Sequence, residues 1–184
     1  NITINHNEKI FIYGETGCGK STLLDLILGL KKPNEGQIFI NGKEISNINY
    51  SFNKILGYVP QNVFLFDDTL KNNITLFKEV DDKNLFNQCL KISRLEKLIN
   101  SLSLKENSLV GQNGVKISGG QKQRVGISRE LYKNPDIYVF DESTNSLDEK
   151  TEQEFFENFL DFATNKTIIF VSHNQKLKQY FDKV

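Results

Sequence analysis

One stretch near the start of the chain decides the fold: Gly14-Glu15-Thr16-Gly17-Cys18-Gly19-Lys20-Ser21-Thr22. Its first eight residues match the pattern G-x-x-x-x-G-K-S/T, between an apolar run over 9–13 and a leucine-rich segment over 22–30. A strand, a glycine loop and a helix in this order form a phosphate site, because glycines let backbone N–H groups approach phosphate oxygens and the helix directs its positive end at the same anion. We therefore predict a nucleoside triphosphate site, with Lys20 at the β- and γ-phosphates and the Ser21 hydroxyl on Mg²⁺.

The composition narrows the class of protein. A length of 184 residues suits one well-buried domain, and 23 basic residues balance 23 acidic ones, so we expect no nucleic-acid partner. Two cysteines, Cys18 and Cys89, make no disulfide framework and fit a reduced cytosolic compartment. No apolar run approaches the length needed to cross a bilayer. Because methionine is absent, even at position 1, we expect the sequence to be a piece of a longer polypeptide.

Apolar runs alternate with helical patterns along the chain. Ile2 to Tyr13 predicts an edge segment leading into a buried central strand, and the next segment predicts a helix from Lys20 to Gly29. Asn41-Gly42 between β-prone runs predicts a hairpin over 36–45. Beyond it we expect a strand over 55–59, mainly helices over 67–108, a helix over 118–133, a strand over 137–140, a helix over 149–162 and a strand over 167–171.

The middle block looks mostly helical. Its apolar residues recur at three- and four-residue spacing, among them Leu70, Ile74, Phe77 and Cys89. This spacing predicts that they lie on the apolar faces of helices.

Together these elements predict an α/β fold: a P-loop NTPase with a mainly parallel sheet core, a small antiparallel β subdomain and a helical subdomain. The core and β subdomain would occupy 1–66 and 110–184, and the helical subdomain about 67–109. Ligands bind at the carboxyl ends of parallel strands. Gly14, Asp141 and His173 each lie just past such an end.

Asp141-Glu142 follows the apolar run over 137–140. Alone this is a weak signal, since many strands leave the core at a charged turn. With a phosphate loop upstream, Asp141 is placed to hold the metal, directly or through its waters, and Glu142 to orient or deprotonate the attacking water.

Ser118-Gly119-Gly120-Gln121 is a second helix start suited to an anion, with a hydroxyl N-cap and unobstructed backbone N–H groups. Glycines that merely begin a helix are the plainer interpretation. Ser118 lies 97 positions after Ser21, across a helical block. We therefore expect that Ser118-Gly119-Gly120 does not share the phosphate of the first glycine loop within one molecule. It needs a phosphate from elsewhere.

At this point the chain resembles the nucleotide-binding domain of ATP-binding-cassette (ABC) transporters, over nearly its whole length. The resemblance rests on six motifs in order: Gly14 to Thr22 (Walker A), Gln61 (Q-loop), Ile117 to Gln121 (signature), Ile137 to Glu142 (Walker B), Ser146-Leu147-Asp148 (D-loop) and His173 (switch histidine). The segment over 57–74 resembles the exporter type in particular.

The resemblance implies ATP and Mg²⁺ as ligands, and a partner. Two such domains pack head to tail, each ATP lying between the Walker A loop of one copy and Ser118-Gly119-Gly120 of the other, with Asp148 beside it. Gln61 would sense the metal and γ-phosphate, and His173 would contact the γ-phosphate. A transmembrane domain upstream, in the same polypeptide, would place this domain on the cytoplasmic side of the cell's inner membrane and drive transport.

Three departures from the family pattern stand out. Ile117 replaces the usual leucine of the signature, and we expect it to pack similarly. Asn7 replaces a glycine in the turn before the Walker A strand, which would alter that turn. The aromatic residue that stacks on adenine should precede position 1, because Tyr13 is too close to the loop to replace it.

Two alternatives remain. Soluble cassette ATPases of DNA repair or chromosome maintenance share the motif order but insert long coiled coils between Walker A and the signature, for which 97 positions leave no space. A regulatory cassette would bind ATP without hydrolysing it, but Lys20, Asp141, Glu142 and His173 are all present.

Overall fold

The computed structural model describes residues 2–15, 17–44, 52–145 and 147–184. Its strands are β1 (Lys9–Ile12), β2 (Phe39–Ile40), β3 (Lys43–Glu44), β4 (Leu56–Val59), β5 (Ile137–Asp141) and β6 (Thr167–Val171). Its α-helices are α1 (Lys20–Ile27), α2 (Phe52–Ile55), α3 (Leu70–Thr75), α4 (Lys83–Ile92), α5 (Glu96–Ser101), α6 (Gly119–Lys133) and α7 (Glu149–Phe162). Its 3-10 helices are η1 (Lys105–Asn107), η2 (Gln112–Gly114) and η3 (Gln175–Tyr180).

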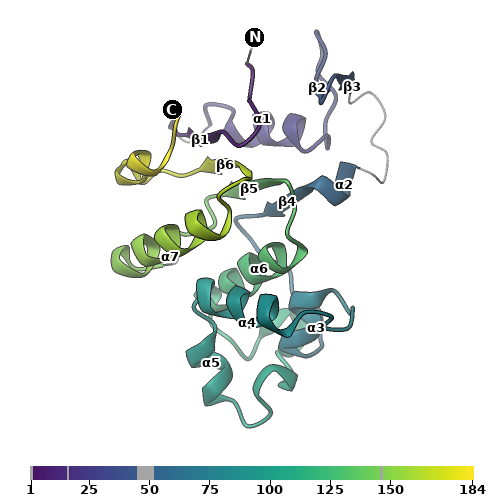
Figure 1. The fold of residues 1–184 in the computed structure, drawn as a ribbon, viewed down its shortest axis with the longest axis vertical. Coiled ribbons are helices and arrows are strands. Elements are labelled where there is room, and N and C mark those ends of the chain that lie inside the picture. The colour runs from purple at the N-terminus through teal and green to yellow at the C-terminus, as the bar shows by residue number, and fades with distance from the viewer. Residues whose placement is uncertain (1, 16, 45–51, 146) are drawn as a thin grey trace.

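The main sheet has the order β1-β6-β5-β4, and all its neighbouring strands are parallel. Figure 1 shows α1 on one side of this sheet and α6 and α7 on the other, with α3, α4 and α5 beyond α6. Parallel strands need crossover connections, which these helices supply. The predicted α/β class with a mainly parallel core is therefore confirmed.

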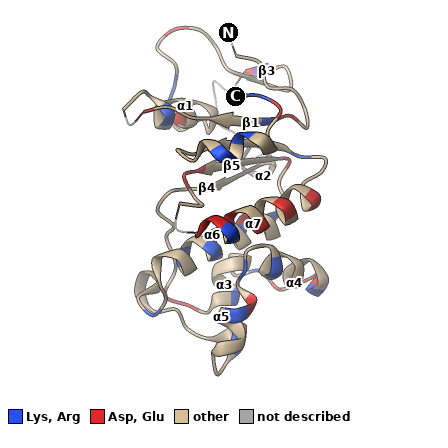
Figure 2. Cartoon of the chain, turned by 90° about the vertical axis from the view of Figure 1, so that its left-hand side faces the viewer, with Lys and Arg blue, Asp and Glu red and all other residues tan. Residues whose placement is uncertain are grey.

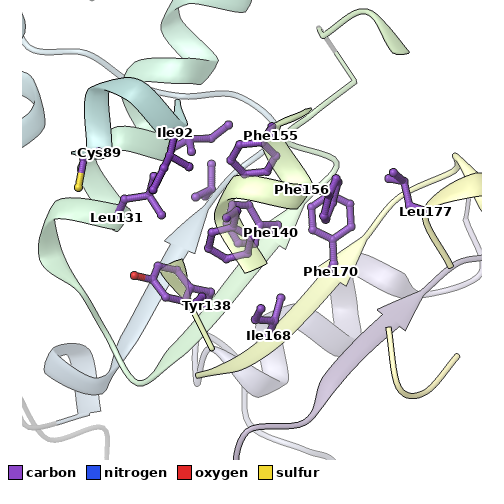
Figure 3. Close-up of a cluster of buried hydrophobic side chains, with 14 of the residues drawn as sticks. Cys89, Ile92, Leu131, Tyr138, Phe140, Phe155, Phe156, Ile168, Phe170 and Leu177 are labelled. Carbon is purple, nitrogen blue, oxygen red and sulfur yellow. The ribbon is translucent and has the colours of Figure 1, made fainter. Parts of the chain in front are cut away.

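Both faces of the sheet are buried, because successive side chains of a strand point to opposite sides. Toward α1, Val139, Ile169 and Val171 pack with Leu24 and Leu28. Toward α6 and α7 a larger, aromatic cluster forms around Phe140 and Phe170 (Figure 3). Its other labelled members include Tyr138, Ile168, Phe155, Phe156, Leu131, Ile92 and Cys89. Burial on both faces explains why these strands read as continuous apolar runs.

The first strand was predicted to be central, and it has a chain segment on both sides although only one of them is a strand of the sheet. β1 stands at one end of the four described strands, and only Phe11 in it is fully buried. The far side of β1 is covered by the C-terminal segment, where Phe11 N–H donates to the Lys183 carbonyl over 2.9 Å and Asp182 N–H donates to the Lys9 carbonyl over 2.9 Å. An apolar run shows that a strand is buried, but not which neighbours pair with it.

The hairpin prediction is confirmed between β2 and β3. Asn41 and Gly42 both have positive φ, of 50° and 75°, as a tight primed turn requires. Position 45, the end of the predicted hairpin, lies outside the described residues.

The segment over 67–109 contains α3, α4, α5 and η1, and most of a second hydrophobic cluster. That cluster also includes Leu65 and, from α6, Val125, so it is continuous with the helix that faces the sheet. Phe77 departs from the prediction. It lies after the end of α3 with φ of 64°, its side chain is 54% exposed, and it packs edge to face against Phe66.

The two family departures that the structure describes are accommodated. Asn7 has φ of 64°, and asparagine tolerates this left-handed conformation better than most residues, so it serves the turn in place of glycine. Its backbone N–H donates to Thr167 Oγ1 over 3.0 Å. Ile117 is partly buried against the second cluster, as expected.

Basic and acidic residues are interspersed over the face shown in Figure 2, with acidic positions recurring along α7. Within the described residues no helix is long and apolar enough to span a bilayer.

Candidate functional site

The glycine loop after β1 takes a backbone conformation that only glycine adopts freely. Gly17 and Gly19 have φ of 87° and 98°, and Gly19 is the N-cap of α1 without any side-chain cap. The first N–H groups of α1 thus lack a capping side chain, which is the arrangement that a phosphate can satisfy. Thr16, which we predicted to be part of this loop, lies outside the described residues.

Two side chains of the loop have defined contacts. Lys20 Nζ donates to the carbonyls of Gly14 and Glu15, each over 2.9 Å, so the ammonium folds back over the loop. A Cβ at Gly14 would lie 2.7 Å from Cys18 Sγ, so a larger residue at position 14 would require the Cys18 side chain to turn away. Cys18 itself is exposed.

Ser21 and Thr22 occupy the first turn of α1, and both are exposed. Their hydroxyls are therefore accessible beside the loop.

Asp141 is the last residue of β5, and its carboxylate accepts a hydrogen bond from Tyr58 Oη over 3.3 Å. Burial raises the pKa of Asp141 above its usual range, and the nearby Glu142 and Asp25 act in the same direction. The Tyr58 hydrogen bond and the attraction of Lys20 act against this shift in pKa. The same burial, with Asp141 as neighbour, raises the pKa of Tyr58 to about 12. A partly buried carboxylate whose ionised form is stabilised by a nearby cation is suited to bind a metal ion.

Glu142 is the centre of the site. His173 Nε2 lies 2.6 Å from Glu142 Oε1, and Glu142 Oε2 accepts hydrogen bonds from Gln61 Nε2 over 3.2 Å and from Asn145 Nδ2 over 3.3 Å. The Glu142 side chain is only 14% exposed, whereas that of His173 is 45% exposed. Three segments, after β4, after β5 and after β6, therefore meet on one carboxylate.

The backbone of Glu142 is unusual as well. Its φ is 49°, although non-glycine residues rarely adopt positive φ, and its N–H donates to the Val171 carbonyl over 2.9 Å. Held in this conformation, the residue turns out of β5 beside the end of β6. Strained backbone of this kind clusters at functional sites.

The second glycine segment is organised differently. Ser118 and Gln121 form a capping box: Ser118 Oγ accepts from Gln121 N–H over 3.3 Å, and Ser118 N–H donates to Gln121 Oε1 over 2.8 Å. The side chain of Gln121 is thus engaged in the cap. A Cβ at Gly119 would meet nothing within 4 Å, and the Gly120 carbonyl accepts from Arg124 Nε over 3.3 Å.

Asp148 is the N-cap of α7. Its carboxylate accepts from Thr151 N–H over 3.0 Å and from Thr151 Oγ1 over 2.6 Å, and these hydrogen bonds hold its pKa below the usual range. Its neighbour Ser146 lies outside the described residues.

The structure thus brings part of the predicted set together. Gln61, Glu142 and His173 are in direct contact, and Lys20 is near enough to Asp141 to act on the pKa of that carboxyl. Among the hydrogen bonds and ion pairs of the described residues, none joins 118–121 or Asp148 to this group. Figure 1 shows α1 and α6 on opposite sides of the sheet.

Two contact residues were missed from the sequence. Tyr58 was placed in a strand and in the exporter-like segment over 57–74 without a role in the site, and Asn145 was given no role. A polar side chain near the carboxyl end of a parallel strand was the signal available for both.

The donor set fits Mg²⁺ bound together with a nucleotide. Within the described residues no group of three or more His, Cys, Asp or Glu side chains gathers into a metal cage. Mg²⁺ is usually bound by one or two carboxylates together with substrate phosphates and water. One half-buried aspartate beside a hydroxyl-bearing phosphate loop matches that chemistry.

Known proteins are similar to this chain in sequence and in fold. The family model for ABC transporters matches residues 1–145. An export ATP-binding/permease protein of Rickettsia typhi is 36% identical over 173 residues, covering 94% of this chain and 30% of that protein. The mitochondrial iron-sulfur clusters transporter ATM1 of Kluyveromyces lactis is 36% identical over 187 residues, covering 99% and 26%.

A solved structure of a bacterial Atm1-family ABC exporter with ATP bound superimposes with a TM-score of 0.90 at 34% identity, covering 97% of this chain and 32% of that one. The chain therefore spans about a third or less of the length of these matched proteins.

Proposed function

The chain belongs to the ABC transporter family as a nucleotide-binding domain of the exporter type, and from this premise we propose that it hydrolyses Mg·ATP to drive transport across a membrane. The observation that carries the proposal is the meeting of Gln61 and His173 on Glu142, one residue beyond Asp141. The matched proteins are named as exporters and transporters. These names do not favour the alternative of a soluble cassette ATPase of DNA repair or chromosome maintenance.

We assign the roles as follows. The backbone of 14–19 and Lys20 bind the phosphates, while Ser21 and Asp141 hold Mg²⁺, with Gln61 near it. When bound, Mg²⁺ neutralises phosphate charge. Glu142 accepts a hydrogen bond or a proton from the attacking water, because a carboxylate is the base available at this edge of the sheet.

Three neighbours hold the base for that task. His173, Gln61 and Asn145 contact both oxygens of Glu142, so the carboxylate has a defined orientation before any water arrives. The His173 side chain is 45% exposed, against 14% for Glu142, and we assign to it the contact with the γ-phosphate. Orienting a base within a few tenths of an ångström is worth large factors in rate.

The partners belong to the proposal too. Gly119 leaves the start of α6 open, and we assign to the turn over 118–120 the phosphates of ATP bound to a second copy or a close relative, with Asp148 near the contact. A transmembrane domain in the same polypeptide completes the exporter, with this domain on the cytoplasmic side of the inner membrane.

The test uses the full protein in membrane vesicles. Inside-out vesicles should hydrolyse added ATP and right-side-out vesicles should not. Lys20→Ala should abolish hydrolysis and nucleotide binding, while the matched control Lys31→Ala should retain both, because Lys31 is 58% exposed and its ion pair among the described residues is with the partly exposed Asp25. Unchanged hydrolysis in Lys20→Ala would refute the assignment.

A further inference from the structure

Glu152 is a buried carboxylate in the first turns of α7 that the catalytic set above does not include. The residue is only 5% exposed. Its two oxygens each accept one hydrogen bond, Oε1 from Thr144 Oγ1 over 2.5 Å and Oε2 from Asn174 Nδ2 over 2.7 Å. Both donors are neutral side chains, and Thr144 is fully buried.

Burial of the Glu152 carboxylate costs folding free energy, because the group loses its contact with water and neutral hydrogen bonds offset that loss only in part. The positive end of α7 offsets part of this cost, because Glu152 lies in its first turn. The bridge also defines the position of both donors closely. The two donors come from different loops, one after β5 and one after β6.

Each donor is next in sequence to a residue that contacts Glu142. Thr144 precedes Asn145, whose Nδ2 donates to Glu142 Oε2 over 3.3 Å. Asn174 follows His173, whose Nε2 lies 2.6 Å from Glu142 Oε1. Glu152 therefore bonds to the same two loops whose neighbouring residues contact Glu142.

Asn174 is itself well anchored. Its backbone N–H donates to Ser172 Oγ over 3.0 Å, and its Oδ1 accepts from Lys176 N–H over 3.2 Å, which caps η3. Only its amide nitrogen is committed to Glu152. Thr144, Glu152, His173 and Asn174 also line one pocket of ≈ 510 Å³, so the bridge borders the space beside His173.

We propose that Glu152 is a positioning residue for ATP hydrolysis, which sets the spacing between the loops after β5 and β6 and thereby the contact of His173 and Asn145 with Glu142. The inference rests on the proposed function, since it concerns the same reaction. It assigns no contact between Glu152 and nucleotide.

Steady-state kinetics of the full protein test this role. Glu152→Ala should lower kcat on the order of 10- to 100-fold, because small displacements of a catalytic group are costly. KM for Mg·ATP and the affinity for a fluorescent ATP analogue, measured by titration, should stay within about twofold, because the phosphate loop is untouched. Glu157→Ala is the matched control, since Glu157 lies exposed on the same helix and, within the described residues, its side chain accepts a hydrogen bond only from Gln153.

A reciprocal exchange separates positioning from folding. Asn174→Asp places a second carboxylate against Glu152 and should lower kcat in the same way. Combining it with Glu152→Gln reverses the polarity of the bond, since the new amide can donate to the new carboxylate, and should restore most of the lost kcat. This pair decides the question even if Glu152→Ala fails to fold.

The outcomes are distinct. A folded Glu152→Ala protein with kcat within twofold of the unmodified protein would overturn the inference. So would an exchange that regains the unfolding temperature without regaining kcat, because Glu152 would then serve the fold alone. An unmodified protein that binds ATP but does not hydrolyse it would instead refute the proposed function, and the inference with it.

Discussion

Two regions are suited to phosphate: the loops at the carboxyl ends of β1, β5 and β6, and the first turn of α6. Their side chains are organised to different degrees. At the strand ends, Lys20 bonds to loop carbonyls, Asp141 accepts from Tyr58, and Glu142 is held by three side chains. At the start of α6, Ser118 and Gln121 bond mainly to each other, and the space beside Gly119 is open.

The two regions have different requirements. A catalytic carboxylate must be oriented before reaction, so its partners come from the same chain and are already in place. A helix start that only binds an anion needs exposed N–H groups and little else. In the proposed function, the first region is a prepared half-site, and we propose that the second is the surface that completes the half-site of another copy.

The sharpest way to break this comparison is Glu142→Gln. The amide keeps the shape of the side chain but loses the base, so hydrolysis should fall on the order of 10²- to 10⁴-fold while ATP binding remains. An ATP-bound dimer should then accumulate on a sizing column. Turnover at the unmodified rate would show that another residue acts as the base.

Mixing two inactive variants tests whether the start of α6 serves a second copy. Lys20→Ala removes the phosphate cation, and Gly120→Asp forces a carboxylate against phosphate, so each protein alone should be inactive. A mixed dimer has one site with both defects and one with neither, and hydrolysis and ATP-dependent dimerisation should partly return. Complete inactivity of a verified mixed dimer would count against sites shared between copies.

Thiol chemistry tests how open the phosphate loop is. Cys18 is exposed in the loop, whereas Cys89 is buried, and burial raises the pKa of Cys89 to about 12, so that it stays protonated at neutral pH. A maleimide should label Cys18, block hydrolysis and be excluded by Mg·ATP, with the label located by peptide mass spectrometry.

Cys18→Ser should retain turnover and resist the reagent. Preferential labelling of Cys89, or labelling of Cys18 that ATP does not affect, would mean that Cys18 does not face the phosphate site.

The smallest expected effect is the change in unfolding temperature when Asp141 is replaced. Because burial raises the pKa of Asp141 in the folded chain, its ionised form costs stability in full at every pH above that raised value. The cost shrinks as the pH falls below that value and is gone below the pKa of Asp141 in the unfolded chain. Without nucleotide, Asp141→Asn should therefore raise the unfolding temperature slightly at pH 7, and the gain should shrink toward acidic pH. Tyr58 keeps an acceptor, since the amide oxygen replaces the carboxylate.

Magnesium-dependent nucleotide binding should be lost in the same variant, as expected for a functional carboxylate that is stabilised by its ligand rather than by the fold. A lower unfolding temperature at neutral pH would show that the charge of Asp141 supports the apo structure.

Local signals predicted most of the elements. Asn41-Gly42 predicted the turn of the hairpin, and the helices over 119–133 and 149–162 and the strand over 167–171 were located to within a residue or two. These features depend on backbone preferences and on periodicity over a few residues, which a sequence displays directly. Phe77 was misjudged because its spacing matched a helix that the chain had already left at Thr75.

The sequence by itself determined the phosphate loop, the acidic end of β5 and the second glycine turn, because each needs particular residue types at adjacent positions. Only the tertiary structure decided that β5 lies between β4 and β6, and so that Gln61, His173 and Asn145 meet on Glu142 while Thr144 and Asn174 meet on Glu152. Pairing of parallel strands joins segments far apart in the chain, and a hydrogen bond depends on distances of a few tenths of an ångström. No local pattern carries that information.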